Sequence, residues 1–383
     1  MSYSSVRLSE SFQFRKHANN LYWIGLNFQG DSSIRMNENK NYRAGIIGLG
    51  MIGGADPVSA GAIGQAVESL DGTHLDALRD HDRVRMVAGS SRDAGRRERF
   101  AERSGANVYA DFHEMLERDR LDIVSIASRS PAHAEQAVAC AEAGVRAIFC
   151  EKPITTTAED GNRVVTACRQ HGTLLLVNHQ RRFDPNYRKV RDLVAAGELG
   201  ELTSCLLQWG SGRLGNVGTH TIDAIRMLTS RQVEAVSGHL DLSGRPDCRG
   251  EEFQDPGGWG MLRMEGGLVI LVDAADYGTV PFHIGLNLTG GRIRMAPDGA
   301  HIERTGEETE HWPVVRDETT FMHGAVAEIV RCLDDNAKPD IPVDDAVRTL
   351  EAIVAFHVSH DRNGQWVNLP LEGEDRGREV RSG

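Results

Sequence analysis

A regular alternation of apolar and amphipathic segments, from about residue 43 to residue 178, constrains the fold of this chain most. Five short apolar runs are predicted strands: residues 43–50, 84–91, 121–128, 145–153 and 173–180. Helical periodicity lies between them, at residues 94–105, 112–120, 133–144 and 157–172. Continuous apolar strands that alternate with helices indicate a parallel sheet covered on both faces. The sequence therefore predicts a doubly wound α/β domain of the Rossmann type over residues 43–178.

The alternation of strands and helices ends at about residue 182, after which several strands follow one another. Predicted strands lie at residues 201–210, 233–240, 259–267, 268–278, 282–291 and 292–299, and predicted helices at 187–200, 218–228, 321–336 and 343–362. Consecutive strands without crossover helices predict a mostly antiparallel sheet. The second domain is therefore expected to be α+β with an open sheet, over residues 179–370. The charged, glycine-rich residues 371–383 are predicted to fray.

Residues 1–42 follow neither period, and two interpretations stay open. They are an extension, disordered or created by an incorrectly assigned start codon ahead of Met36, or an arm that packs on a partner subunit. The second interpretation rests on the apolar residues 21–24, which are costly to leave in water.

Composition excludes several classes of function. A formal net charge of -12 and a pI near 5.7 argue against nucleic acid as a partner, because phosphate binding needs clustered Lys and Arg. No apolar run approaches the ~20 residues that span a bilayer, so no membrane partner is expected. The spacing of the cysteines predicts reduced thiols in a cytoplasmic protein: Cys140, Cys150, Cys168, Cys205, Cys248 and Cys332. No zinc-binding pattern appears, so no metal site is predicted.

A glycine motif follows the first predicted strand. Gly48, Gly50 and Gly53 form G-x-G-x-x-G, which lets a backbone turn approach a pyrophosphate at a helix N-terminus. Together with Met51 and Ile52 they are predicted to bind a dinucleotide. The segment after Gly53 delays the expected helix, and this insertion is expected either to lengthen the helix or to add a lid.

The end of the second predicted strand indicates which dinucleotide binds. An NAD site places an acidic residue there, whereas this chain has Ser90, Ser91 and Arg92. Small hydroxyls leave room for a 2′-phosphate and an arginine can pair with it. The sequence therefore favours NADP over NAD. The alternative is that Asp93 binds the ribose and Arg92 is only solvated.

A second motif, Glu151-Lys152-Pro153, follows the fourth predicted strand. Ligands of open α/β sheets bind at the carboxyl ends of strands, so Lys152 is either a solvated turn residue or a ligand contact. With "GIIGLGMIG", "NHQRRFDP", "AAGELGEL", "GNVGTHTIDAIRML" and "GQWVNLP", this motif resembles the glucose–fructose oxidoreductase and inositol dehydrogenase family, Gfo/Idh/MocA, over residues 43–370.

The resemblance implies a catalytic set. Lys152 would lie beside the nicotinamide and the substrate hydroxyl, and Pro153 would follow a cis peptide bond. His220 would accept the hydroxyl proton, a role that suits an imidazole because its pKa lies near working pH. Asn216 stands where the family pattern D-x-G-x-H-x-x-D has aspartate. An amide adds no charge, so we expect a less basic His220 and leave open whether Lys152 or His220 is the main proton acceptor.

The remaining site residues are expected around these. Besides the glycine motif and residues 90–92, the predicted cofactor contacts are Ala127, Ser128, His133, Glu151, Lys152, Gln180 and Arg182. The predicted substrate contacts are Lys152, Asn178, Arg182, Asn216, Thr219, His220 and Asp223. His133 is expected to be mainly structural, and Arg182 has a salt bridge as its alternative.

These expectations combine into one function. The chain is predicted to be an NAD(P)-dependent dehydrogenase acting on a secondary hydroxyl of a sugar, inositol or related polyol, assembled as a homodimer or homotetramer through its second sheet. Two alternatives stay open: a redox-assisted sugar lyase or glycosidase with tightly bound cofactor, and a non-catalytic NAD(P)-sensing regulator.

Overall fold

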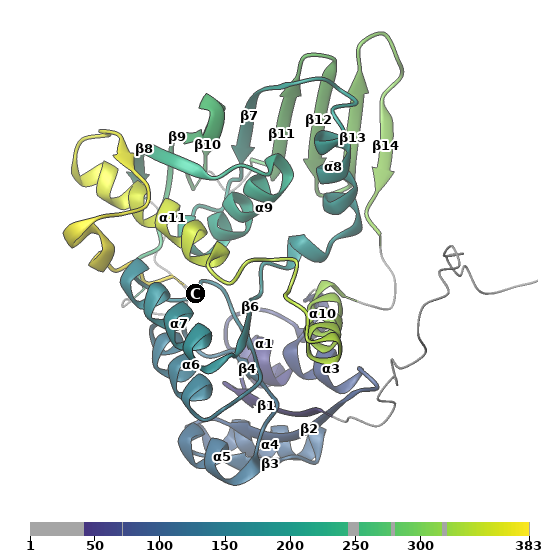
Figure 1. Cartoon of the computed structure of the whole chain (residues 1–383), viewed down its shortest axis with the longest axis vertical. Coiled ribbons are helices and arrows are strands. Elements are labelled where there is room, and N and C mark those ends of the chain that lie inside the picture. The colour runs from purple at the N-terminus through teal and green to yellow at the C-terminus, as the bar shows by residue number, and fades with distance from the viewer. Residues whose placement is uncertain (1–41, 71, 244–252, 277–279, 316–319, 383) are drawn as a thin grey trace, which may run out of the picture. The chain divides into compact units, whose positions relative to one another are not determined.

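The computed structural model describes residues 42–382, except residues 71, 244–252, 277–279 and 316–319. The predictions made for residues 1–41 and for Cys248 lie outside the described residues. Two sheets organise the described part of the chain, and Figure 1 shows them with the helices that cover them.

The first sheet is parallel and has six strands in the order β3-β2-β1-β4-β5-β6. Its strands are β1 Tyr42–Ile47, β2 Val84–Ser90, β3 Asn107–Tyr109, β4 Ile123–Ile126, β5 Ala147–Cys150 and β6 Leu174–Val177. The predicted Rossmann-type sheet is confirmed. The sequence missed only β3, since three residues are too few to show a period. The order reverses between β1 and β4, and this is where open α/β sheets bind ligands.

Helices cover both faces of this sheet: α3 His74–Arg79, α4 Ala94–Ser104, α5 Phe112–Asp119, α6 His133–Glu142 and α7 Ala158–His171. The predicted stop at Gly172 is confirmed, because this residue caps α7 with a left-handed backbone.

The insertion after Gly53 breaks the first helix rather than lengthening it. Helix α1 spans only Met51–Gly54, because Ala55 turns the chain into the left-handed region at φ 52°. The side chain of Asp56 then caps α2, Pro57–Gly61, and is itself held by two bonds from Arg99 of α4, at 2.7 and 2.8 Å. These charge-assisted bonds fix the insertion to the neighbouring helix and lower the pKa of Asp56 despite its burial.

The second sheet has nine strands in the order β14-β13-β12-β11-β7-β10-β9-β8-β15. They are β7 Leu202–Gln208, β8 Val233–Asp241, β9 Gly257–Met264, β10 Val269–Asp273, β11 His283–Leu288, β12 Gly291–Ala296, β13 Gly299–Arg304, β14 Glu310–Pro313 and β15 Val367–Asn368. Only the pair β7 and β10 is parallel among these strands, so the mostly antiparallel prediction is confirmed.

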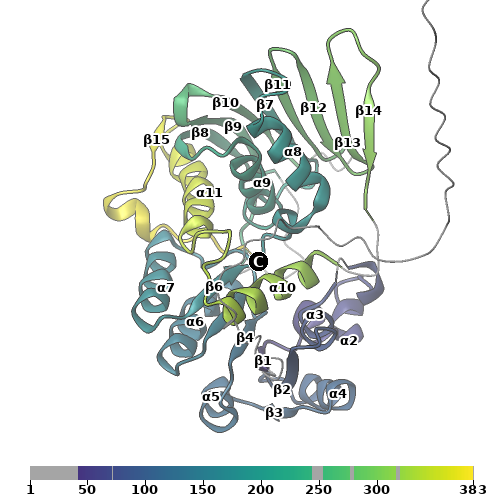
Figure 2. The same ribbon diagram turned by 45° about the vertical axis from the view of Figure 1, so that its right-hand side comes forward.

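Three helices pack on one face of this sheet, as Figure 2 shows: α8 Pro185–Ala195, α9 Thr219–Thr229 and α11 Asp345–Asp361. Helix α10, Phe321–Asp335, lies within the predicted second domain but packs on the first sheet instead. Its apolar side chains Met322, Val326 and Ile329 share a buried cluster with strand residues of that sheet. The chain therefore returns to its first domain before α11.

The predicted fraying of residues 371–383 is wrong for the part of the tail that the structure describes. Leu371 and Val380 are buried, and the backbone N–H of Val380 donates to Thr156 O at 2.8 Å. Arg378 pairs with Asp361 of α11 at 2.6 Å. A charged composition suggested fraying, but two well-placed apolar residues and a salt bridge hold this tail on the protein.

Two further findings concern the chain as a whole. Within the described residues, none of the helices has the length and apolarity needed to cross a membrane. The five described cysteines are buried and form no disulfide with one another.

Candidate active site

The glycine turn at the end of β1 brings backbone segments closer together than a Cβ atom would allow. Gly48 has φ 97°, and a Cβ there would lie 2.6 Å from the carbonyl of Ala127, which follows β4. A Cβ on Gly53 would overlap the carbonyl of Gly48. At Gly50 the surroundings are open, and only the guanidinium of Arg96 comes within 4.0 Å of such a Cβ. This turn therefore fits the close backbone approach that a dinucleotide pyrophosphate needs.

The residues after β2 include Arg92 and, in the first turn of α4, Arg96, whose guanidinium lies near Gly50. Ser90 is buried, Ser91 is partly buried and Arg92 is exposed. The carboxylate of Asp93 caps α4 by accepting from Arg96 N at 2.9 Å, so it already has a partner. Arg96, in the first turn of α4, was missed in the sequence analysis.

The turn after β5 places Lys152 at the carboxyl end of the parallel sheet. The Lys152–Pro153 peptide bond is cis, as the resemblance implied. His133 is buried beneath this turn, where Nδ1 contacts Pro153 O at 2.9 Å and Nε2 contacts Ser128 O at 3.1 Å. Its ring thus joins the turns that follow β4 and β5, which agrees with the mainly structural role predicted for it.

A buried hydrogen-bond chain supports the same turn from the other side. Glu151 accepts from His74 Nε2 at 3.0 Å, from Asn178 Nδ2 at 2.7 Å and from the backbone N–H of Lys152 at 3.2 Å. Burial disfavours its charge, but the bond and charge of His74 outweigh burial and lower the pKa of Glu151 to about 2. Since the ionised carboxylate only accepts, His74 donates to it from Nε2, and Nδ1 of the same ring contacts Ser125 Oγ.

Lys152 meets the second domain at Asn216. Its Nζ donates to the side-chain Oδ1 of Asn216 and lies 3.3 Å from the backbone oxygen of the same residue. Asn216 lies in a single π-helical turn, Leu214–Gly218, immediately before α9. Buried Asp255 accepts from Gly215 N at 2.6 Å and from Asn216 N at 2.9 Å, and so fixes this turn.

His220 lies in the first turn of α9, next to this contact. Its Nδ1 is buried and has no hydrogen-bond partner among the described residues. Burial, and then the charges of Lys152 and Arg181, hold the pKa of His220 well below its ordinary value. Because Lys152 contacts Asn216, four residues before His220, the ammonium and the imidazole lie in one region. The lowered pKa favours the neutral imidazole at pH 7.

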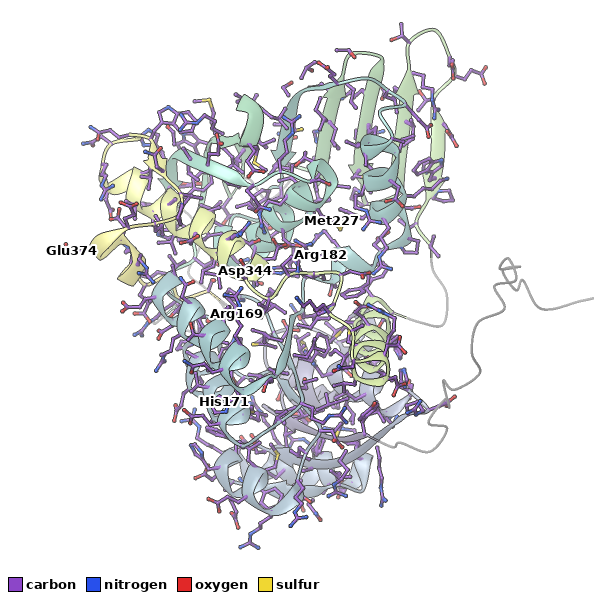
Figure 3. The ribbon with its side chains drawn as sticks, in the orientation of Figure 1. Arg169, His171, Arg182, Met227, Asp344 and Glu374 are labelled. Atoms are coloured by element: carbon purple, nitrogen blue, oxygen red, sulfur yellow. The ribbon has the colours of Figure 1, made fainter. Side chains whose placement is uncertain are left out.

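Arg182 and Asp223 form a buried ion pair. Arg182 donates to Asp223 at 2.7 and 2.8 Å and also pairs with Asp345, which in turn accepts from Arg226 at 2.5 Å. Figure 3 labels Arg182 between the two sheets. The salt-bridge alternative therefore describes Arg182 in this structure, and these two arginines and two aspartates tie α9 to α11.

The predicted residues thus separate into two groups. Lys152, Asn216 and His220 come together where the two domains meet, and the glycine turn lies at the same carboxyl edge of the first sheet. Thr219 and Asp223, by contrast, are each only 1% exposed, and Thr219 Oγ1 lies 3.0 Å from Nε2 of buried His179. This burial argues against their predicted substrate contacts.

Asn178, which bonds to Glu151, is also buried. Gln180, Ala127 and Ser128 are partly exposed near the strand ends. Sequence reasoning missed His74, Asp255 and Asp345, because each acts through contacts distant in the sequence.

Comparison with known proteins identifies the family. A family model described as "Oxidoreductase family, NAD-binding Rossmann fold" matches residues 42–179. Inositol 2-dehydrogenase 2 of Saccharopolyspora erythraea is 30% identical over 292 residues, which cover 71% of this chain and 78% of that protein. The chain belongs to this family of NAD-binding oxidoreductases, Gfo/Idh/MocA, as its motifs predicted.

Two further relatives agree with this assignment. The dTDP-3,4-didehydro-2,6-dideoxy-alpha-D-glucose 3-reductase of Saccharopolyspora spinosa is 28% identical over 331 residues, covering 80% of this chain and 88% of that one. The WlbA dehydrogenase from Bordetella pertussis, solved in complex with NADH and UDP-GlcNAcA, superposes with a TM-score of 0.68 at 21% identity, covering 87% of this chain and all of that one. This second likeness concerns the fold.

Proposed function

We propose that the protein is an NAD(P)-dependent dehydrogenase that oxidises a secondary hydroxyl of a sugar, inositol or related polyol, or reduces the matching ketone. The observation that carries this proposal is the contact of Lys152 with Asn216, beside His220, at the carboxyl edge of the parallel sheet. The printed names of two relatives, an inositol 2-dehydrogenase and a sugar-nucleotide reductase, support a polyhydroxy substrate.

A bound nicotinamide supplies the acceptor for the hydride that leaves the carbinol carbon. The protein must then take one proton from the hydroxyl oxygen. The neutral imidazole of His220 is suited to accept it. Lys152, held by Asn216, is suited to hold the substrate oxygen by donating a hydrogen bond. In the reverse direction His220 returns the proton to the carbonyl oxygen, and Lys152 again holds that oxygen by a hydrogen bond.

NADP is the proposed cofactor. Ser90, Ser91 and Arg92 lie at the end of β2. The acidic residue that follows them, Asp93, already serves as the N-cap of α4. Arg96 adds a second guanidinium next to Gly50. Two arginines at this point favour a 2′-phosphate and disfavour a bare ribose only weakly.

A homodimer or larger homo-oligomer through the second sheet is also proposed. The face of this sheet opposite α8, α9 and α11 exposes large apolar side chains on β9 and β10: Trp259 is 46% exposed and Leu271 48%. Met261 and Val269 extend the patch. Adjacent strands carry these residues on one face, and a second copy of the chain would remove the patch from water.

The test is turnover by the purified protein. Sugars, inositols and related polyols are offered with NAD+ or NADP+, and formation of the reduced nicotinamide is followed by absorbance. We expect at least one polyol to be oxidised, and we expect Lys152→Met and His220→Gln to lower kcat about 10²–10⁴-fold. The exposed Lys338→Met should have no effect.

Three results would count against this proposal. They are the absence of any polyol that changes the cofactor absorbance, full kcat in the two variants, and cleavage of the substrate without net cofactor reduction. The last result would identify the lyase alternative instead.

A further inference from the structure

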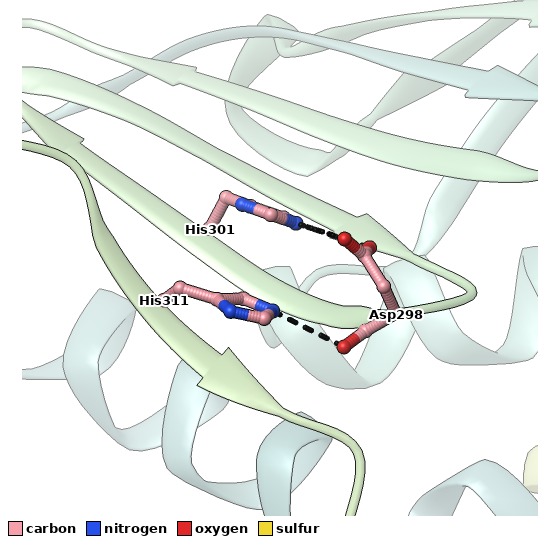
Figure 4. A group of neighbouring side chains, drawn as sticks. All are labelled: Asp298, His301 and His311. Atoms are coloured by element: carbon pink, nitrogen blue, oxygen red, sulfur yellow. Dashed lines mark hydrogen bonds and ion pairs between the residues drawn. The ribbon is translucent and has the colours of Figure 1, made fainter.

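Three side chains with metal-binding donor atoms gather at the edge of the second sheet, away from the candidate active site. They are Asp298, in the turn between β12 and β13, His301 on β13 and His311 on β14. One donor atom from each lies within 4.8 Å of the other two, and Figure 4 shows both rings directed at Asp298.

Strand pairing fixes the two histidines side by side. His301 and His311 are direct partners in the antiparallel ladder of β13 and β14. Their ring centroids lie 4.5 Å apart with an angle of 16° between the planes. The neighbouring Trp312 packs under Lys189 of α8, so the two imidazoles project from the opposite, open face of the sheet. Direct partners on one face are held at the spacing that a shared ligand requires.

The distances between these donor atoms and Asp298 are close to those between two ligands of one metal ion. Nε2 of His301 is 3.0 and 3.1 Å from the two carboxylate oxygens of Asp298, and Nε2 of His311 is 3.1 Å from its backbone oxygen. Two ligand atoms on one tetrahedral zinc ion, each about 2.0–2.2 Å from the metal, are about 3.3 Å apart. The ion would take the place of the Nε2 protons that now face Asp298.

The electrostatic surroundings of this group are mixed. Asp298 offers an exposed carboxylate that already accepts from Nε2 of His301, so its oxygens are available as ligands. Arg294 on β12 is the direct ladder partner of His301, and its positive charge opposes a cation there. Removal of the charge of Arg294 by substitution therefore provides one test of the site.

We propose that Asp298, His301 and His311 form a binding site for one divalent transition-metal ion, and that Zn²⁺ is the preferred ion. Imidazole and carboxylate suit this ion, and three protein ligands leave a fourth position for water. The ion would join edge strand β14 to the turn between β12 and β13. Sequence patterns did not reveal the site, since its donors come from a turn and two strands rather than one helix.

The experiment titrates Zn²⁺ into untagged, chelator-treated, full-length protein by calorimetry. We expect a saturable site that is lost in the His301→Gln/His311→Gln double variant and weakened about tenfold or more in Asp298→Asn. Arg294→Gln should tighten binding about twofold, because it removes a nearby positive charge. The matched control is His171→Gln, an exposed histidine on α7, which should bind like the wild type.

Two results would overturn the proposal. One is the lack of saturable binding by the wild type; the other is a site of equal affinity in the double variant, which would place zinc elsewhere on the chain. Thermal unfolding of each variant without metal checks that its fold is intact. Asp298→Asn removes only one exposed carboxylate, so it remains informative if the double variant is unstable.

Discussion

Nζ of Lys152 donates a hydrogen bond to Oδ1 of Asn216, a residue 64 positions further along the chain. The first domain supplies the ammonium and the π-helical turn before α9 supplies the amide. An amide oxygen orients the ammonium without adding charge, and His220 keeps a strongly lowered pKa next to it.

Asn216→Asp should therefore raise the pKa of His220. A carboxylate beside Lys152 would offset the positive charge that now disfavours imidazolium. We expect the acidic limb of the pH profile of kcat/KM to move up by about one pH unit. Asn216→Ser, which adds no charge, is the control. If the two variants share one acidic limb, Asn216 does not set the basicity of this site.

Arg96 should determine cofactor selectivity together with Arg92. If a 2′-phosphate binds at the end of β2, Arg96→Ala removes a charge-assisted bond, and KM for NADPH should rise about 10–100-fold while KM for NADH changes little. Arg85→Ala, on the exposed side of the same strand, should alter neither constant. Equal effects on both cofactors would instead place Arg96 at the pyrophosphate.

His74 should act as a positioning residue for the Lys152 turn. His74→Phe removes the donor that keeps Glu151 ionised, so the pKa of Glu151 should rise from about 2 toward neutrality. Glu151 would then become protonated in the assay range, and kcat should fall about tenfold with a new loss of activity on the acid side. His74→Gln, which can still donate, should restore most of this activity.

A purely structural role of His74 would give a different result. Both variants would then lose thermal stability, and the pH profile of the remaining activity would be unchanged.

Strand ends and helix stops could be predicted from the sequence because apolar periodicity and glycine positions are local properties. Lys152 and His220 could be predicted because short motifs mark them. The contacts that hold them could not: His74 reaches Glu151 across 77 positions, and Asp255 reaches the Asn216 turn across 39. Nothing in the spacing of such residues distinguishes a buried partner from a surface charge. The burial of Asp223 escaped prediction for the same reason.

The apolar face of the second sheet should hold the oligomer together. Leu271→Glu places a charge in the centre of the Trp259, Met261 and Leu271 patch, and the molar mass in light scattering should fall to that of one chain. The control is Val58→Lys on α2, which replaces a residue that is 57% exposed outside this face. A wild type that is already monomeric, or a Leu271→Glu variant of unchanged mass, would contradict the proposed interface.

Acid should destabilise the protein partly through His357 of α11. Burial, and then the charge of Arg378, lower the pKa of His357 to about 4, and its buried Nε2 has no partner among the described residues. The unfolded chain, with a histidine pKa near 6.5, binds this proton more readily than the folded chain between pH 6.5 and 4. Stability is therefore complete above pH 6.5 and is lost as the pH falls, by about 2 kcal/mol at pH 5 from this residue.

His357→Leu should remove that loss. We expect the slope of unfolding free energy against pH, measured by urea denaturation between pH 4.5 and 6, to decrease by about 1.2 kcal/mol per pH unit. The matched control is His171→Leu on α7, which should leave the slope unchanged because this side chain is exposed to water in the folded protein. If His357→Leu keeps the wild-type slope, His357 is protonated in the folded protein and the burial argument fails at this position.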